Sequence, residues 1–232
     1  MSWETKYRVE FYDLGNIPWR IDISEEDHSG GITTLQGAST PVVFDFKNNS
    51  DEYDDPIRSS DAMIQVMALS NFQLKELYSL QDMQWKITIY ENETLNWQGY
   101  NRTRYHQEAY EPIPYTVQIV GVCGLELLQQ IPYLEADGDY YEGRKLESEI
   151  ILTILGKIGY NTFAEYVDLY EDRINDTTGD SSLEQIKIDV DILRDLTCYE
   201  VLIKILEKYR AVITQVDGMF QIYRPVSLVK DT

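Results

Sequence analysis

Residues 115–128 read Tyr-Thr-Val-Gln-Ile-Val-Gly-Val-Cys-Gly-Leu-Glu-Leu-Leu, and they separate two kinds of sequence. Positions 115–122 largely alternate apolar and polar side chains, which is typical of a strand with one buried face. Gly124 and the leucines after it predict a short helical turn that ends before Pro132, because proline cannot continue a helix. We therefore predict an α+β protein, with a β-rich, barrel-like domain over 1–122 and a smaller mixed α/β domain over 123–232.

The first domain is predicted to consist of closely spaced strands. Apolar residues alternate in 7–11 and again in 19–23, and the turn Asp13–Pro18 lies between them, so these two segments predict a hairpin. Strands at this spacing favour an antiparallel barrel or sandwich over βαβ units. Further strands are expected at 41–46, 62–69, 84–90 and 95–98, with a hairpin loop at 91–94 and an exposed, mobile polar loop at 47–61.

The second domain is predicted to begin with a helix over 147–158. Its Ile and Leu residues recur at helical spacing, and Gly159 is suited to the C-cap. A polar, flexible linker is expected near 172–182.

Next, Thr197 and Glu200 have the spacing of a capping box, which opens a helix. One face of that helix is expected to carry four apolar and aromatic residues: Tyr199, Leu202, Leu206 and Tyr209. The chain then closes with a β-hairpin, 211–216 and 219–223, because Asp217-Gly218 supplies the positive φ angles of a type I′ turn.

Charge is the most unusual property of the composition. Forty Asp and Glu against 20 Lys and Arg give a net charge of −20. Nucleic-acid binding and docking on anionic membranes both require a basic surface. We therefore expect no specific nucleic-acid binding, and no membrane anchor either, since no run approaches the roughly 20 apolar residues of a membrane-spanning helix. The acidity either favours solubility or repels a polyanion.

No motif for catalysis, a cofactor or a metal is readable. His28 and His106 are the two histidines, and neither has sequence neighbours that predict a metal or acid–base site, so we expect both to be surface residues. The acidic segments 51–55 and 137–139 could bind calcium but lack the EF-hand pattern, and we expect solvated loops. Cys123 and Cys198 are expected to be reduced core residues. We predict no catalytic, cofactor-binding or metal-ligating residues.

Two other functions remain open from the residues alone. One is a carbohydrate- or peptide-binding module, because four aromatic residues lie around one predicted hairpin and could line a surface cleft: Trp85, Tyr90, Trp97 and Tyr100. The other is a hydrolase built on paired carboxylates, a pattern with almost no specificity in so acidic a chain.

The order of the elements resembles the N-terminal region of phage baseplate hub, or tail-associated, proteins at the tail tip. In this sequence the resemblance is carried by strand 115–122, the step Gly124-Leu-Glu-Leu-Leu128, Ile131-Pro-Tyr133, an Ile/Leu helix, a linker, Thr197-Cys-Tyr-Glu-Val-Leu202 and Asp217-Gly-Met-Phe-Gln-Ile-Tyr223.

This resemblance implies a structural virion protein, not an enzyme, that is assembled in the host cytoplasm. It implies a homotrimeric ring that caps the tail tube, contacts the tube, distal tail, fibre or tape-measure proteins, and lets DNA pass. A negative lumen would then help DNA to slide during ejection. Family members often continue into further domains, so we expect a short member or part of a longer product.

Overall fold

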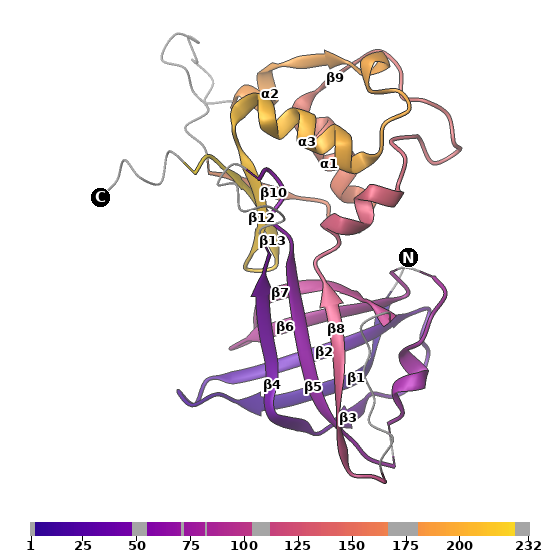
Figure 1. The fold of residues 1–232 in the computed structure, drawn as a ribbon, viewed down its shortest axis with the longest axis vertical. Helices are drawn as coiled ribbons and strands as arrows, with labels where there is room; N and C mark the ends of the chain where they lie inside the picture. Colours follow the sequence, from indigo (N-terminus) through magenta and orange to yellow (C-terminus); the bar gives the residue numbers. More distant parts are fainter. Residues whose placement is uncertain are drawn as a thin grey trace. The chain divides into compact units, whose positions relative to one another are not determined.

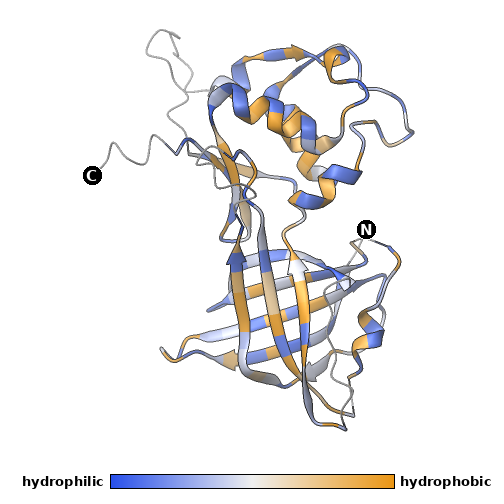
Figure 2. Cartoon of the chain, in the orientation of Figure 1, coloured by the Kyte–Doolittle hydropathy of each residue, from blue (hydrophilic) through white to orange (hydrophobic). Residues whose placement is uncertain are grey.

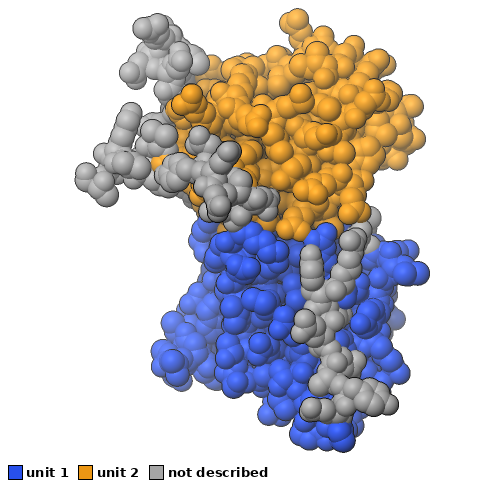
Figure 3. All heavy atoms as spheres, in the orientation of Figure 1, with its two compact units in different colours: residues 1–47, 60–123, 216–218 blue, residues 48–59, 124–215, 219–232 orange. Residues whose placement is uncertain are grey.

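The structure is a computed structural model of the 232-residue chain. It describes residues 3–47, 55–70, 72–81, 83–103, 112–166 and 181–225. The chain forms two compact units, which Figure 3 colours separately. Unit 1 comprises 1–47, 60–123 and 216–218, and unit 2 comprises 48–59, 124–215 and 219–232.

Unit 1 is built on one eight-stranded sheet with the order β3-β1-β2-β6-β7-β8-β5-β4 (Figure 1). A short 3-10 helix, η1 (Leu74–Leu77), precedes β6. The strands are β1 (Trp3–Tyr12), β2 (Pro18–Glu26), β3 (Thr33–Leu35), β4 (Gly37–Phe46), β5 (Ser60–Ala68), β6 (Trp85–Glu91), β7 (Thr94–Asn101) and β8 (Tyr115–Val122).

The sheet is open, so the prediction of a barrel-like closure is wrong. A barrel has no edges because its last strand pairs with its first. Here β3 and β4 are the two end strands, and in the described part of the chain they do not pair with each other. β3 is three residues long and pairs in parallel with Tyr7–Val9 of β1. It is too short to close the sheet, and this parallel pair was also not predicted.

Most strands of this unit were predicted correctly. β1 and β2 form the expected hairpin, in which Val9 pairs with Ile21 and both side chains are fully buried. β8 has the predicted bounds. Apolar and polar residues alternate along the strands, as Figure 2 shows, and the apolar side chains of one face form the core.

Two glycines make room for the largest side chain of this core. Trp97 on β7 is 2% exposed, and its Nε1 donates to the Ser60 hydroxyl at 3.0 Å. A Cβ atom on Gly121 would lie 2.9 Å from Cη2 of the Trp97 ring, and one on Gly99 would lie 2.5 Å from the same atom. The indole ring therefore occupies space that alanine at either position would fill.

Unit 2 contains short helices and two small sheets, with the orders β10-β13-β12 and β11-β9. None of its described helices, nor η1, has the length and apolar character needed to cross a membrane. The elements are η3 (Leu125–Gln130), β9 (Arg144–Leu146), α1 (Glu147–Gly156), β10 (Phe163–Tyr166), α2 (Ser182–Gln185), β11 (Lys187–Asp189), η4 (Val190–Leu193), α3 (Cys198–Tyr209), β12 (Val212–Val216) and β13 (Met219–Tyr223).

The two main helices form as predicted, with one correction. Thr197 and Glu200 make the reciprocal hydrogen bonds of a capping box at the start of α3. Of the four residues predicted on one face of α3, Leu202 and Leu206 are buried, whereas Tyr199 and Tyr209 are only half-buried. The residues of α3 that are buried are Cys198, Val201, Leu202, Ile205 and Leu206. α1 ends at Gly156, and Gly159, with a φ of 78°, lies in the turn that follows it.

The C-terminal hairpin is confirmed. β12 and β13 are neighbours, and Asp217 and Gly218 between them have φ angles of 49° and 68°.

The prediction of an exposed loop over 47–61 is wrong where the structure describes it, since Ile57 is fully buried and forms a bridge with Ile213 of β12. Residues 48–54 and most of the predicted linker, 172–180, lie outside the described residues.

Candidate functional site

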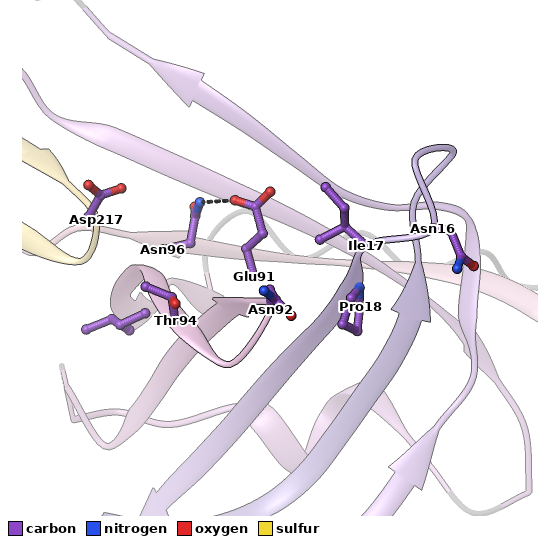
Figure 4. Close-up of a pocket in the computed structure, with 9 residues that line it drawn as sticks. Asn16, Ile17, Pro18, Glu91, Asn92, Thr94, Asn96 and Asp217 are labelled. Atoms are coloured by element: carbon purple, nitrogen blue, oxygen red, sulfur yellow. Dashed lines mark hydrogen bonds between the residues drawn. The ribbon is translucent and has the colours of Figure 1, made fainter.

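A pocket of about 470 Å³ lies in unit 1 among turns that hydrogen bonds hold in place (Figure 4). The Asp13 carboxylate accepts from the amides of Gly15 and Ile17, which shapes the turn between β1 and β2. The Asn92 amide donates to the Pro18 carbonyl at 2.8 Å, so the turn between β6 and β7 is tied to the first turn. The lining residues are Asn16, Ile17, Pro18, Glu91, Asn92, Thr94, Leu95, Asn96 and Asp217.

The lining of this pocket can form hydrogen bonds but has no nucleophile paired with a base. Its only carboxylates are those of Glu91 and Asp217, and its other polar side chains are amides and one hydroxyl. Glu91 accepts from Asn96 Nδ2 at 3.1 Å, as the dashed line in Figure 4 marks. General acid–base or nucleophilic catalysis requires a reactive group within reach of a second one. The described lining therefore supports binding of a small polar group more than it supports turnover.

His28 lies beside one carboxylate rather than in a cluster of possible metal ligands. Its Nδ1 is 3.7 Å from the Glu25 carboxylate, which also accepts from Lys6 at 3.1 Å. Among the residues that the structure describes, no three His, Cys, Asp or Glu side chains converge as metal ligands would. His106 lies outside the described residues.

The acidic segments show no converging ligands where they are described. Asp137 and Asp139 are exposed, and Asp137 Oδ1 accepts from the Asp139 amide at 3.2 Å within a turn. Of the segment 51–55, only Asp55 is described, and its carboxylate accepts from the Ile57 amide.

The four aromatic residues proposed as a carbohydrate platform do not form a surface cleft. Trp85, Trp97 and Tyr100 are 3%, 2% and 2% exposed. Burial raises the pKa of the Tyr100 hydroxyl to about 12. Tyr90 is half-buried, under the Arg20 guanidinium at 4.2 Å. The alternative of a surface cleft is not supported, because the β6–β7 hairpin lies in the middle of the sheet and three of these side chains pack in the core.

One fully buried carboxylate in unit 2 was missed by sequence reasoning. Glu147, the first residue of α1, accepts from Lys208 at 2.8 Å and from the Tyr209 hydroxyl, both at the end of α3. Burial, followed by the bond to Glu147, raises the pKa of Tyr209. A buried carboxylate is tolerated when it is paired and hydrogen-bonded. Because both of its oxygens are engaged, we interpret Glu147 as a structural link between the two helices.

Half-buried Glu165 on β10 is the described carboxyl group whose pKa is raised. Burial is the main cause. Burial also raises the pKa of Cys198 to about 11. Both cysteines are free and buried, as predicted. A thiol with a raised pKa is a weak nucleophile at neutral pH, so Cys198 is a core residue.

Comparisons with known proteins find a likeness among solved structures. No family model and no curated protein matches the chain. Among solved structures, the chain is similar to the 43 kDa tail protein of prophage MuSo2 from Shewanella oneidensis, with 13% sequence identity and a TM-score of 0.41. The match covers 72% of this chain and 47% of that protein, so this chain spans about half its length. A similarity this low does not indicate a shared function.

Proposed function

We propose that this protein is a structural component of a phage tail tip. In this proposal it acts as a baseplate hub subunit: three copies form a ring that caps the tail tube and lets DNA pass, with tube, distal tail, and fibre or tape-measure proteins as neighbours. The protein would be assembled in the host cytoplasm and remain in the virion. It would have no catalytic turnover.

The order of elements at one junction is the observation that carries this proposal. The sequence resemblance depends on a β-rich region that ends in a strand and passes through a Gly-Leu-x-x-Leu step into a helical region. β8 ends at Val122, and Gly124 adopts a left-handed conformation with a φ of 96° as the N-cap of η3. Glycine suits this position because other residues resist positive φ. The two helices and the C-terminal hairpin follow in the order that the resemblance requires.

The acidity gives the proposal a physical reason. Double-stranded DNA carries one negative charge per about 1.7 Å of its axis. A basic channel would bind it through counterion release, whereas an acidic wall repels it weakly over about 8–10 Å near physiological salt. The loop around Asp137 exposes several carboxylates that such a wall could use: Glu135, Asp137, Asp139 and Glu142.

Gold-labelled antibody against this chain on intact phage particles tests the location. We expect the label at the tail tip in negative-stain images, and none on particles from a phage that lacks the gene. Label on the capsid or along the tube would contradict the assignment, as would purified particles that contain none of the protein.

A further inference from the structure

The pocket in unit 1 lies where three turns meet, and hydrogen bonds hold these turns together. Two of them are the turns of the β1–β2 and β6–β7 hairpins, and the third is 216–218, which belongs to the same unit. The Asn92 amide donates to the Pro18 carbonyl at 2.8 Å, and Gln98 Nε2 donates to the Gly218 carbonyl at 2.7 Å. A ligand therefore meets a preformed site, which lowers the entropy cost of binding.

Most polar side chains of this lining have hydrogen-bonding capacity that the chain itself does not use. Within the part of the chain that the structure describes, four of them make no hydrogen bond or ion pair: Asn16, Asn92, Thr94 and Asp217. Asn96 donates one N–H to Glu91 at 3.1 Å, which orients both side chains and leaves the amide oxygen of Asn96 and the second oxygen of Glu91 free to accept. The pocket thus offers both donors and acceptors to a ligand.

The charge of the lining excludes anionic ligands. Among the described residues that line the pocket, none is Lys, Arg or His, and the charged groups are the carboxylates of Glu91 and Asp217. A phosphate, a sulfate or a ligand carboxylate would be repelled. A hydroxyl group suits the lining better, because it donates to a carboxylate or amide oxygen and accepts from an amide N–H.

The arrangement of the polar groups also argues against a metal ion. Figure 4 shows the labelled side chains as a row, with Asp217 at one end, Asn16 at the other, and Glu91 and Asn96 between them. Calcium requires about six to eight oxygen atoms around one point, and in the described ranges no three His, Cys, Asp or Glu side chains converge in that way. A row of groups matches a ligand whose hydroxyl groups are spread along its length.

Aliphatic side chains lie beside the polar ones. Ile17 is 37% exposed, and it lines the pocket together with Pro18 and Leu95. A sugar ring has hydroxyl groups at its rim and C–H groups on its faces, so it can contact both kinds of side chain at once. The volume of about 470 Å³ falls within the range of about 300–1,000 Å³ that is usual for small-ligand sites.

We propose that this pocket is a binding site for a neutral saccharide. Sugar hydroxyl groups donate to the carboxylates of Glu91 and Asp217 and accept from the Asn92 amide, and a C–H face of the ring packs on Ile17 and Pro18. The site is at the turns and is separate from the aromatic residues of the β6–β7 hairpin, which are in the core. The inference goes beyond the proposed structural role and does not depend on it.

NMR titration of the isotope-labelled full chain tests the site. The probes are the neutral methyl glycosides of glucose, galactose, rhamnose and N-acetylglucosamine. We expect at least one of them to shift the amides of 14–18 and 91–96 saturably, with a Kd on the order of 1 mM, which is the affinity that an ordinary ligand efficiency gives a molecule of this size. Glucose 6-phosphate and calcium chloride should cause no saturable shift of these amides, because the phosphate is repelled and the calcium ligands are missing.

Matched variants test the role of the lining. Glu91→Gln with Thr94→Val removes a carboxylate and a hydroxyl group with little change in size, and the control, Glu4→Gln with Thr116→Val, makes the same changes at exposed strand residues of unit 1 outside the lining. The test variant should bind the glycoside at least about tenfold more weakly, because a hydrogen bond to a charged group is lost. The control should bind like the unchanged protein, and circular dichroism checks that both are folded.

Each outcome decides the inference. The absence of saturable shifts with all of the glycosides would overturn it, as would shifts outside these turns or equal binding by the test variant. Saturable shifts of the same amides by glucose 6-phosphate or calcium would also overturn it. If the test variant does not fold, the position of the shifts in the unchanged protein still decides. Gold labelling measures the location of the protein separately, so failure of the proposed function is distinguishable.

Discussion

Replacing Gly99 with alanine should destabilise unit 1 severely. A Cβ at this position would lie closer than 3.0 Å to the Val122 carbonyl oxygen, and at 2.5 Å from Cη2 of Trp97. The carbonyl belongs to the neighbouring strand and cannot rotate away, so β7 and β8 would have to separate. Overpacking a core costs about 1–3 kcal/mol when side chains can adjust. We therefore expect a loss of about 3 kcal/mol or more in the free energy of unfolding, because here the backbone must move.

Two other glycines provide graded controls. A Cβ on Gly121 would meet only side chains, Trp97 at 2.9 Å and Ile87 at 3.1 Å, so Gly121→Ala should cost about 1–2 kcal/mol. A Cβ on Gly31 would meet nothing within 4 Å, so Gly31→Ala should be close to neutral. Trp97→Phe removes the outer ring and should relieve Gly121→Ala by about 1 kcal/mol, but it should relieve Gly99→Ala far less.

Urea unfolding followed by tryptophan fluorescence measures these changes in unit 1 alone. All four tryptophans, Trp3, Trp19, Trp85 and Trp97, belong to that unit. The packing argument is refuted if Gly99→Ala is as mild as Gly31→Ala, or if Trp97→Phe rescues Gly99→Ala as fully as it rescues Gly121→Ala.

Three further predictions concern the hairpin and the capping box. Gly218→Val should lower the free energy of unfolding in urea by about 2 kcal/mol or more, because the φ of Gly218 is 68° and the new Cβ would overlap the Leu95 side chain. The control is Gly143→Ala: Gly143 has a φ of 80° but open space around it, so this change should cost only the backbone strain of about 1 kcal/mol. Thr197→Ala should cost about 1 kcal/mol, measured by far-UV circular dichroism, and Thr197→Ser should retain most of that stability. Hydrogen bonds from the backbone amide and the hydroxyl of Thr197 lower the pKa of Glu200 below 4.5. The stabilising effect of the Glu200 carboxylate is therefore present above pH 4.5 and is lost as pH falls through the lowered pKa. The stability of Glu200→Gln should lack that part of the pH dependence, and an unchanged acid profile would count against the capping box.

The parts of this fold that the sequence predicted depend on neighbours in the chain. The β1–β2 and β12–β13 hairpins have alternating strands on either side of a short turn, and the capping box of α3 needs only residues 197–200. Such signals are readable without knowledge of distant contacts.

The parts that were missed depend on distant partners. β10 pairs in parallel with β13, and Ile57 forms a bridge with Ile213, so neither segment has a turn that would mark its partner. Glu147 is more than 60 residues from Lys208, and its burial cannot be read from its own segment. The sequence also could not show that the β6–β7 hairpin lies inside the sheet, which places Trp97 in the core instead of a cleft.

Cryo-electron microscopy of the tail tip in intact particles tests the central claim most directly. We expect three copies of this chain around a channel, with acidic side chains facing the bore. A single copy outside the channel, or a ring whose bore is neutral or basic, would contradict it.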